Sequence, residues 1–272
     1  KKSMQALSDA LEDSLKKSGV NIVFGQKVNS INFDYVKKSW KVCASSKQEK
    51  MVYFADDVIY TPPPQSLLKH LENPLDKDHN YKKRIQSLPD PSGALVFYSA
   101  LKKDHIKLIS SNHYQFVSNE LGSLFVSISE EGDGRAPKGE ITLIASLFTK
   151  TNDWFSLDKH DYVKKKKEYL QKISMVLENQ FDIASENWLH KELATPLGFE
   201  RWTNRPNGIV GGLGQNPEIF GLFGLSSRTP FKGLWLCGDS IYPGEGTAGV
   251  SQSALMVSRQ ILASKGINNF NL

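Results

Sequence analysis

The stretch GLWLCGDSIYPGEGTAGVSQSALMVSRQIL, residues 233–262, decides the fold class. It opens on a continuous apolar run, Leu234 to Cys237, which is typical of a parallel strand buried on both faces. A glycine-rich loop follows, and the rest of the stretch has the apolar spacing of a helix. Strand, loop and helix in this order predict part of an α/β domain. The helix residues expected to face the core are Val250, Ala254, Leu255, Val257, Ile261 and Leu262.

The loop contains GEGTAG, Gly244 to Gly249, which matches the dinucleotide-binding pattern G-x-G-x-x-G letter for letter. That pattern needs its first glycine directly after the strand and an acidic residue about 20 positions further on. Here the strand ends near Cys237, well before Gly244, and Asn268 to Phe270 offer no carboxylate at the later position. The match is therefore not interpreted as a dinucleotide fingerprint.

Two other interpretations fit the loop. Gly238 and Asp239 follow the strand at its carboxyl end, where α/β folds bind ligands, and Asp239 could accept hydrogen bonds from ligand hydroxyls. The first N–H groups of the helix, around Thr247 to Val250, carry partial positive charge and would stabilise negative charge on a reduced flavin. Alternatively, the glycines only allow a tight turn and close packing of helix on strand. These residues alone leave both interpretations open.

The N-terminal part also has α/β character. Ser3 is expected to cap a helix with apolar residues at Met4, Leu7, Leu11 and Leu15, which ends at Gly19. The sequence ADDVIYTPPP, residues 55–64, predicts a buried strand ended by prolines. Further β-like runs are expected at residues 20–25, 27–34, 39–45 and 50–55.

The middle of the chain differs in character. Four β-like runs, at residues 94–101, 113–119, 123–129 and 140–148, predict an antiparallel sheet. A long helix is expected over residues 158–180, with the lysines at 164–167 mainly on its solvated face. Residues 200–233 are irregular and rich in glycine, which favours a functional segment. We therefore expect domain segments at 1–65, 66–229 and 230–272.

Composition narrows the classes of protein. The 272 residues carry a formal net charge of +5 from scattered lysines, so weak attraction to an anionic membrane is favoured over nucleic-acid binding. Cys43 and Cys237 have no metal or disulfide spacing, and the histidines have no ligand spacing, so no metal is expected. No apolar run reaches the roughly 20 residues of a membrane span. Nothing in the sequence indicates an oligomeric state.

The stretch 233–262 resembles the C-terminal FAD-binding segment of the phytoene-desaturase-like branch of the flavin amine oxidase superfamily. Residues 196–240 resemble carotenoid desaturases and carotene cis–trans isomerases, most of all the cyanobacterial C-3′,4′ desaturase type. Residues 3–31 and 55–64 also match family segments, more loosely. The resemblance implies an α/β (α+β) fold: the C-terminal part of a two-domain, Rossmann-type FAD enzyme whose middle segment is an antiparallel-sheet substrate domain.

The resemblance also implies a cofactor, FAD, and site residues. The implied cofactor-binding residues are Val28, Gly238, Asp239, Gly246, Thr247, Ala248 and Gly249. The implied substrate-side candidates are Pro243, Gly244, Glu245 and Trp202. No catalytic side chain is identified.

The expected function is that of an FAD-dependent oxidoreductase that desaturates or isomerises a carotene-type polyene. Because such substrates partition into bilayers, we expect a peripheral location at a cytoplasmic or thylakoid membrane face. An amine or protoporphyrinogen oxidase is the alternative enzyme. Since the family's N-terminal βαβ unit does not occur in this sequence, a further alternative is a non-catalytic fragment, which would purify without flavin colour.

Overall fold

The computed structural model describes residues 4–47, 49–73, 75–76, 79–89, 92–107, 110–214 and 217–267. The expected cap Ser3, and Asn268 to Phe270, lie outside these residues. The chain divides into two compact units, Lys1–Ile22 with Gly93–Gly208, and Val23–Ser92 with Ile209–Leu272. The sequence predicted boundaries after residues 65 and 229, whereas the two units change over after residues 22, 92 and 208.

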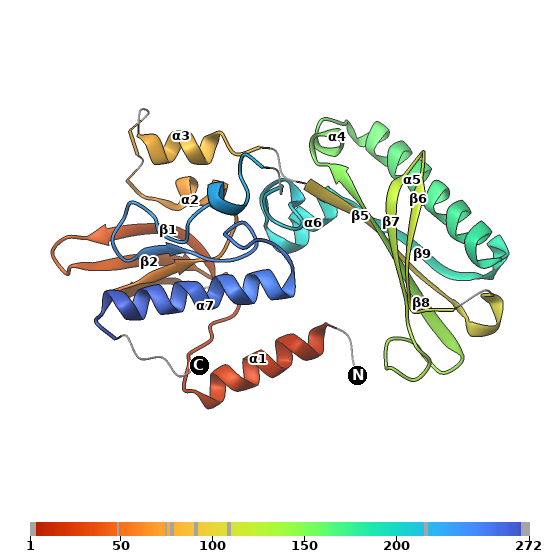
Figure 1. The fold of residues 1–272 in the computed structure, drawn as a ribbon, viewed down its shortest axis with the longest axis horizontal. Coiled ribbons are helices and arrows are strands. Elements are labelled where there is room, and N and C mark those ends of the chain that lie inside the picture. The colour runs from red at the N-terminus through yellow and green to blue at the C-terminus, as the bar shows by residue number, and fades with distance from the viewer. Residues whose placement is uncertain are drawn as a thin grey trace. The chain divides into compact units, whose positions relative to one another are not determined.

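The first unit is built on a five-stranded sheet with the order β6-β7-β8-β5-β9 (Figure 1). The pairs β6–β7, β7–β8 and β5–β9 are antiparallel. Its strands are β5 (Ser92–Lys102), β6 (His113–Ser118), β7 (Gly122–Ile128), β8 (Glu140–Lys150) and β9 (Trp188–Ala194). Its helices are α1 (Gln5–Lys17), α4 (Asn152–Phe155), α5 (Lys159–Phe181) and α6 (Pro196–Thr203), with short 3-10 turns η1 (Lys103–His105), η2 (Ser185–Asn187) and η3 (Pro206–Gly208).

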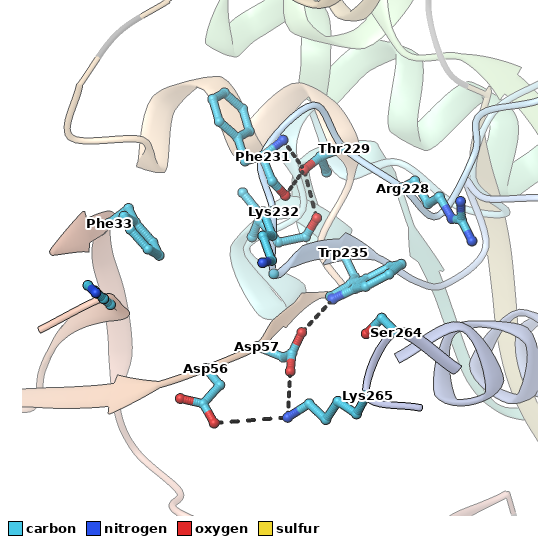
Figure 2. A pocket seen from close by; sticks show the side chains of 13 residues that line it. Phe33, Asp56, Asp57, Arg228, Thr229, Phe231, Lys232, Trp235, Ser264 and Lys265 are labelled. Carbon is cyan, nitrogen blue, oxygen red and sulfur yellow. Dashed lines mark hydrogen bonds and ion pairs between the residues drawn. The ribbon is translucent and has the colours of Figure 1, made fainter. Parts of the chain in front are cut away.

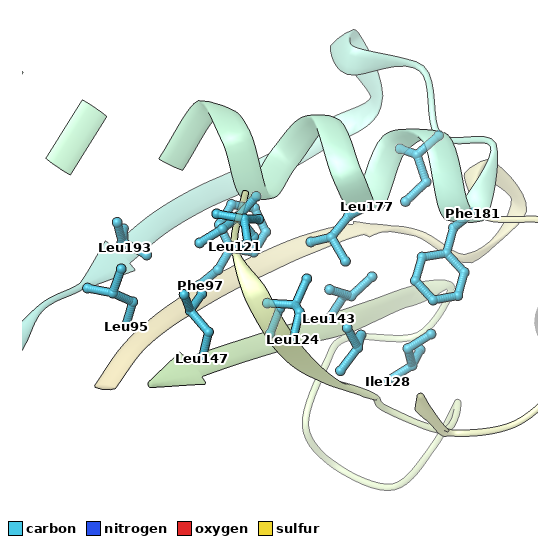
Figure 3. Close-up of a cluster of buried hydrophobic side chains, with 14 of the residues drawn as sticks. Leu95, Phe97, Leu121, Leu124, Ile128, Leu143, Leu147, Leu177, Phe181 and Leu193 are labelled. Carbon is cyan, nitrogen blue, oxygen red and sulfur yellow. The ribbon is translucent and has the colours of Figure 1, made fainter. Parts of the chain in front are cut away.

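The core of this unit lies between the sheet and α5 (Figure 3). Strands β7 and β8 alternate, so that residues such as Leu124 and Leu143 are fully buried on one face. Helix α5 covers that face with Ile173, Leu177 and Phe181. The antiparallel sheet and the long helix expected from the sequence are thereby confirmed, and the mixed α/β class with them.

The second unit combines two sheets (Figure 1). An antiparallel meander has the order β1-β2-β3, and a parallel pair joins β4 and β10. The strands are β1 (Lys27–Asp34), β2 (Ser39–Ser45), β3 (Lys50–Ala55), β4 (Val58–Tyr60) and β10 (Leu234–Leu236). The helices are α2 (Pro64–His70), α3 (Asn80–Gln86) and α7 (Gly246–Ser264), with a 3-10 turn η4 (Gly221–Phe223).

One core cluster holds this second unit together. Ile31 and Trp40 of the meander pack there with Leu67 of α2, Ile85 of α3 and Leu234 of β10. Because α2 and α3 bury their apolar residues in this cluster, residues 66–92 fold with the second unit. Their local sequence pattern gives no sign of this long-range packing.

Three local expectations were wrong. Residues 20–25 form no strand, and Val23 and Phe24 are exposed, because no strand in the described part of the chain pairs with them. Strand β9 was missed because its sequence, WLHKELA, alternates weakly. In α7, Ala254 is exposed, whereas Ser253 and Val257 are its buried residues.

Candidate functional site

The candidate site lies at the carboxyl edge of the parallel pair β4–β10. Leu236 of β10 is aligned with Tyr60 of β4, and the N–H of Cys237 donates to the carbonyl oxygen of Tyr60 at 3.1 Å. Gly238 and Asp239 follow directly. Gly238 has φ +122°, and a Cβ there would lie 3.3 Å from the carbonyl oxygen of Thr61. A glycine is therefore favoured where the chain leaves β10.

Helix α7 is attached to the end of β10 through Ser253. Its hydroxyl accepts a hydrogen bond from the N–H of Gly238 at 3.2 Å and donates to the sulfur of Cys237 at 3.7 Å. Val257, one turn further along α7, is 1% exposed. These contacts hold α7 against the strand. The expected core-facing residues of this helix did not include Ser253, and helical spacing was the one local signal of its structural role.

The N-terminus of α7 has no side-chain cap. Glu245 is the N-cap residue with φ −78° and ψ 173°, but its side chain does not bond the helix N–H groups. Gly246, Thr247 and Ala248 are exposed. Several backbone donors at the positive end of the helix are therefore available to a ligand. This donor set suits an anionic or carbonyl oxygen, so the residues present fit the flavin edge that the sequence analysis placed here.

The structure separates the roles of two glycines. A Cβ at Gly249 would collide with the backbone of Gly244, so the close-packing interpretation holds for Gly249. Gly246, by contrast, has no atom within 4 Å of its Cβ position. The space beside Gly246 is open to a ligand.

The irregular segment after η3 packs against this site. A Cβ at Gly212 would collide with the carbonyl group of Asp239, and a Cβ at Gly211 would collide with the carboxylate of Glu245. The Gly211–Gly212 turn therefore lies directly against both acidic residues. The sequence indicated that this segment is functional, but it did not single out Gly211 and Gly212. The one local feature that marks them is that two glycines are adjacent.

The surroundings of Glu245 disfavour the ionised form of its carboxyl group. Burial and the nearby Asp239 carboxylate raise the pKa of the Glu245 carboxyl above its ordinary value. Its proton is therefore bound more tightly in the folded chain than in the unfolded one.

This shift predicts a pH-dependent effect of the Glu245→Gln substitution. Glu245 contributes stability below its ordinary pKa, and the contribution is lost as pH rises through the raised native pKa. Glutamine does not titrate, so we expect the melting temperature of the variant to rise relative to the parent as pH is raised from the acid to the neutral range. Melting curves of both proteins across this range measure the difference.

Glu131→Gln is the matched control, because the difference in melting temperature between this variant and the parent should change with pH in the opposite direction. The hydrogen bond and charge of Lys103, with a distance of 2.7 Å between Nζ and Oε2, lower the pKa of Glu131. Its contribution is present above the ordinary pKa and is lost as pH falls. If the melting temperatures of the two variants, relative to the parent, changed with pH in the same way, the site of Glu245 would not disfavour its charged form.

Other sequence-predicted residues lie in different elements. Pro243, in a cis peptide with Tyr242, and Gly244 stand in the loop before α7, next to the site. Val28 lies on β1 in the separate three-stranded sheet and is 37% exposed. Trp202 lies on α6 in the first unit and is 81% exposed.

The chain has the α/β fold of FAD-dependent oxidoreductases. An oxidoreductase from Methanosarcina mazei superposes with a TM-score of 0.65 at 18% identity, over 92% of this chain and 53% of that chain. An aklavinone-11 hydroxylase solved with FAD has a TM-score of 0.54 at 11% identity, over 97% of this chain and 42% of that chain. A cyclohexylamine oxidase from Brevibacterium oxydans has a TM-score of 0.51 at 12% identity, over 92% and 51%. No family model matches the chain.

By sequence, the chain is a homologue of chloroplastic prolycopene isomerases. It is 28% identical to the Daucus carota protein over 211 residues, which are 74% of this chain and 34% of that protein. It is 25% identical to the Arabidopsis thaliana protein over 275 residues, covering 96% of this chain and 45% of that protein. The chain thus spans less than half the length of these curated relatives. The resemblance to the carotenoid branch of the superfamily is confirmed.

Proposed function

We propose that this protein is an FAD-dependent enzyme that isomerises cis double bonds of a carotene-type polyene. The supporting observation is the uncapped N-terminus of α7 beside Gly238 and Asp239, at the carboxyl edge of β10. The homologues are named prolycopene isomerases, which indicates the substrate class and the reaction.

Each part of the site has a separate task in this proposal. FAD, when bound, supplies reversible electron transfer to the polyene. The exposed N–H groups at Gly246 to Ala248 orient the ring and stabilise negative charge on it. Asp239 accepts hydrogen bonds from ligand hydroxyls. Glu245 stands next to this position as the N-cap residue of α7.

The polyene is proposed to bind the face of the five-stranded sheet opposite α5. On each strand the residues next to buried core positions point to this second face. Tyr98 of β5, Phe125 of β7 and Phe148 of β8 are 39%, 44% and 67% exposed. Exposed aromatic side chains of this kind suit a long hydrocarbon without polar handles. Trp202 is the proposed additional contact.

A peripheral membrane location completes the proposal. No helix in the described part of the chain is both long and apolar enough to cross a bilayer. A carotene is nevertheless delivered from a bilayer, because its apolar surface partitions out of water.

The reaction is tested with FAD, a reductant and prolycopene in liposomes, without oxygen, followed by chromatography and mass spectrometry. An all-trans product of unchanged mass is expected. In a parallel reaction with oxidised FAD and an added quinone as electron acceptor, in place of the reductant, a product lighter by two hydrogen atoms would identify a desaturase instead. Unchanged prolycopene together with turnover of an amine or a porphyrinogen would contradict the carotenoid proposal.

Asp239→Ala tests the cofactor site. Loss of a charged hydrogen-bond acceptor should weaken FAD binding by roughly tenfold or more, corresponding to about 1.5–3 kcal/mol. Quenching of flavin fluorescence during titration measures the dissociation constant. Asp104→Ala, at an exposed position in η1 of the other unit, is the control and should leave it unchanged. Equal affinities for both variants would show that Asp239 does not contact the cofactor.

A further inference from the structure

The turn between β1 and β2 presents an apolar tip. Tyr35 is 80% exposed and Val36 is 93% exposed. The tip is nevertheless ordered by local bonds: the Asp34 carboxylate accepts from the N–H groups of Val36 and Lys37, both at 2.9 Å. The ring of Tyr35 packs edge-on against Phe33 with 5.2 Å between centroids. A fixed turn therefore holds two apolar side chains out in solvent, where they cost free energy.

Positive charge accompanies this tip. Lys37 places its ammonium group 3.6 Å from the ring centroid of Phe54. Lys38 lines a pocket of about 800 Å³ together with Lys232 from the loop before β10. Figure 2 shows Phe33 on one side of this pocket and Phe231 with Lys232 on the other. The apolar tip and a basic, aromatic pocket are thus neighbours.

The acidic groups of the pocket do not neutralise these two lysines. Asp57 and Asp56 lie 2.9 Å and 4.0 Å from the ammonium group of Lys265, and Asp57 also accepts from the indole N–H of Trp235 at 2.9 Å (Figure 2). In the ranges that the structure describes, no ion pair involves Lys38 or Lys232. Their charges are therefore available to an external anion.

We infer that the β1–β2 turn, Tyr35 to Lys38, docks this unit on an anionic lipid bilayer. Tyr35 and Val36 enter the boundary between headgroups and acyl chains, while Lys38 and Lys232 contact lipid phosphates. An exposed aromatic and an exposed aliphatic side chain, bordered by Lys38 and Lys232, match a bilayer surface in which anionic headgroups cover the acyl chains. The turn between β2 and β3 lacks this combination, since its described residues Ser46, Lys47 and Glu49 are all polar.

The inference deepens the peripheral membrane location proposed above and names the surface responsible. It requires neither FAD nor carotene. Its test therefore uses empty vesicles, so a failure to dock and a failure to isomerise are separate results.

Cosedimentation of the chain with vesicles measures docking. We expect binding to phosphatidylcholine vesicles that contain phosphatidylglycerol, and weaker binding to phosphatidylcholine alone or at high salt. The double variant Tyr35→Ser, Val36→Ser should lower the partition coefficient about tenfold or more. Lys38→Gln should lower it about fivefold on the anionic vesicles only.

Two control variants test whether the loss of any exposed apolar or any basic side chain would weaken vesicle binding equally. Val117→Ser removes an 84% exposed valine from β6 in the other unit, and Lys47→Gln removes a lysine from the β2–β3 turn. Both are expected to bind as the parent does. Controls that lose as much binding as the tip variants, or a parent that does not sediment with anionic vesicles, would overturn the inference.

A second measurement locates the contact directly. In Val36→Trp the new indole should be quenched by brominated lipid more strongly than the indoles of the parent. Indole fluorescence of Val36→Trp that brominated lipid leaves unchanged would overturn the inference. Self-association of the parent in the absence of vesicles, lost in the tip variants, would also overturn it, because the tip would then form a protein–protein contact.

Discussion

Trp154→Ala is expected to lower the free energy of unfolding by about 3–5 kcal/mol. The Trp154 side chain is fully buried in the core between the sheet and α5. Its indole N–H donates to the Thr149 hydroxyl at 2.9 Å, and its rings contact Tyr162 and Tyr169 with centroid distances of 6.1 and 5.6 Å. Alanine would leave a cavity and remove these contacts. Urea unfolding, followed by circular dichroism, measures the loss in the transition of the first unit.

Trp202→Ala is the matched control for that prediction. The same substitution on α6 removes a side chain that is 81% exposed, so the free energy of unfolding should change by no more than about 0.5 kcal/mol. The proposed contact of Trp202 with the polyene predicts a separate effect: this variant should raise the Michaelis constant for the carotene while its stability stays nearly the same. Similar stability losses for the two tryptophan variants would contradict the assignment of the core.

Gly249→Ala is expected to destabilise the second unit by about 1–2 kcal/mol. An added methyl group collides with the backbone of Gly244, which a rotamer change cannot relieve. Overpacking of this kind costs about 1–3 kcal/mol, against which better helix propensity returns up to about 1 kcal/mol. Because the start of α7 must shift, FAD affinity should fall as well. Urea unfolding and flavin titration of the same samples measure both effects.

The control for this variant is Gly198→Ala in helix α6. No atom lies within 4 Å of its Cβ position, so the same substitution should leave stability unchanged or raise it by up to about 1 kcal/mol. Of the two variants, only Gly249→Ala should therefore lower the free energy of unfolding. A stable Gly249→Ala protein with full FAD affinity would show that the loop does not need close packing at Gly249.

Local patterns predicted most of the fold. The β-like runs that became β5 to β8 alternate strongly or are continuously apolar, and α5 and α7 are long, so neighbouring residues alone define them. The failures came where an element depends on a distant partner. Strand β9 is stabilised by pairing with β5, and residues 20–25 have strand-like composition but no pairing in the described part of the chain.

The same distinction applies to the candidate site. The sequence alone determined the order of strand, glycine-rich loop and helix, and it placed Gly238 and Asp239 after β10 because a strand end can be located from local apolarity. Only the tertiary structure brought Gly211 and Gly212 against Glu245 and Asp239, and assigned to Ser253 the attachment of α7. These contacts join residues far apart in the chain, and their free energy comes from packing and desolvation, which exist only once the core has formed.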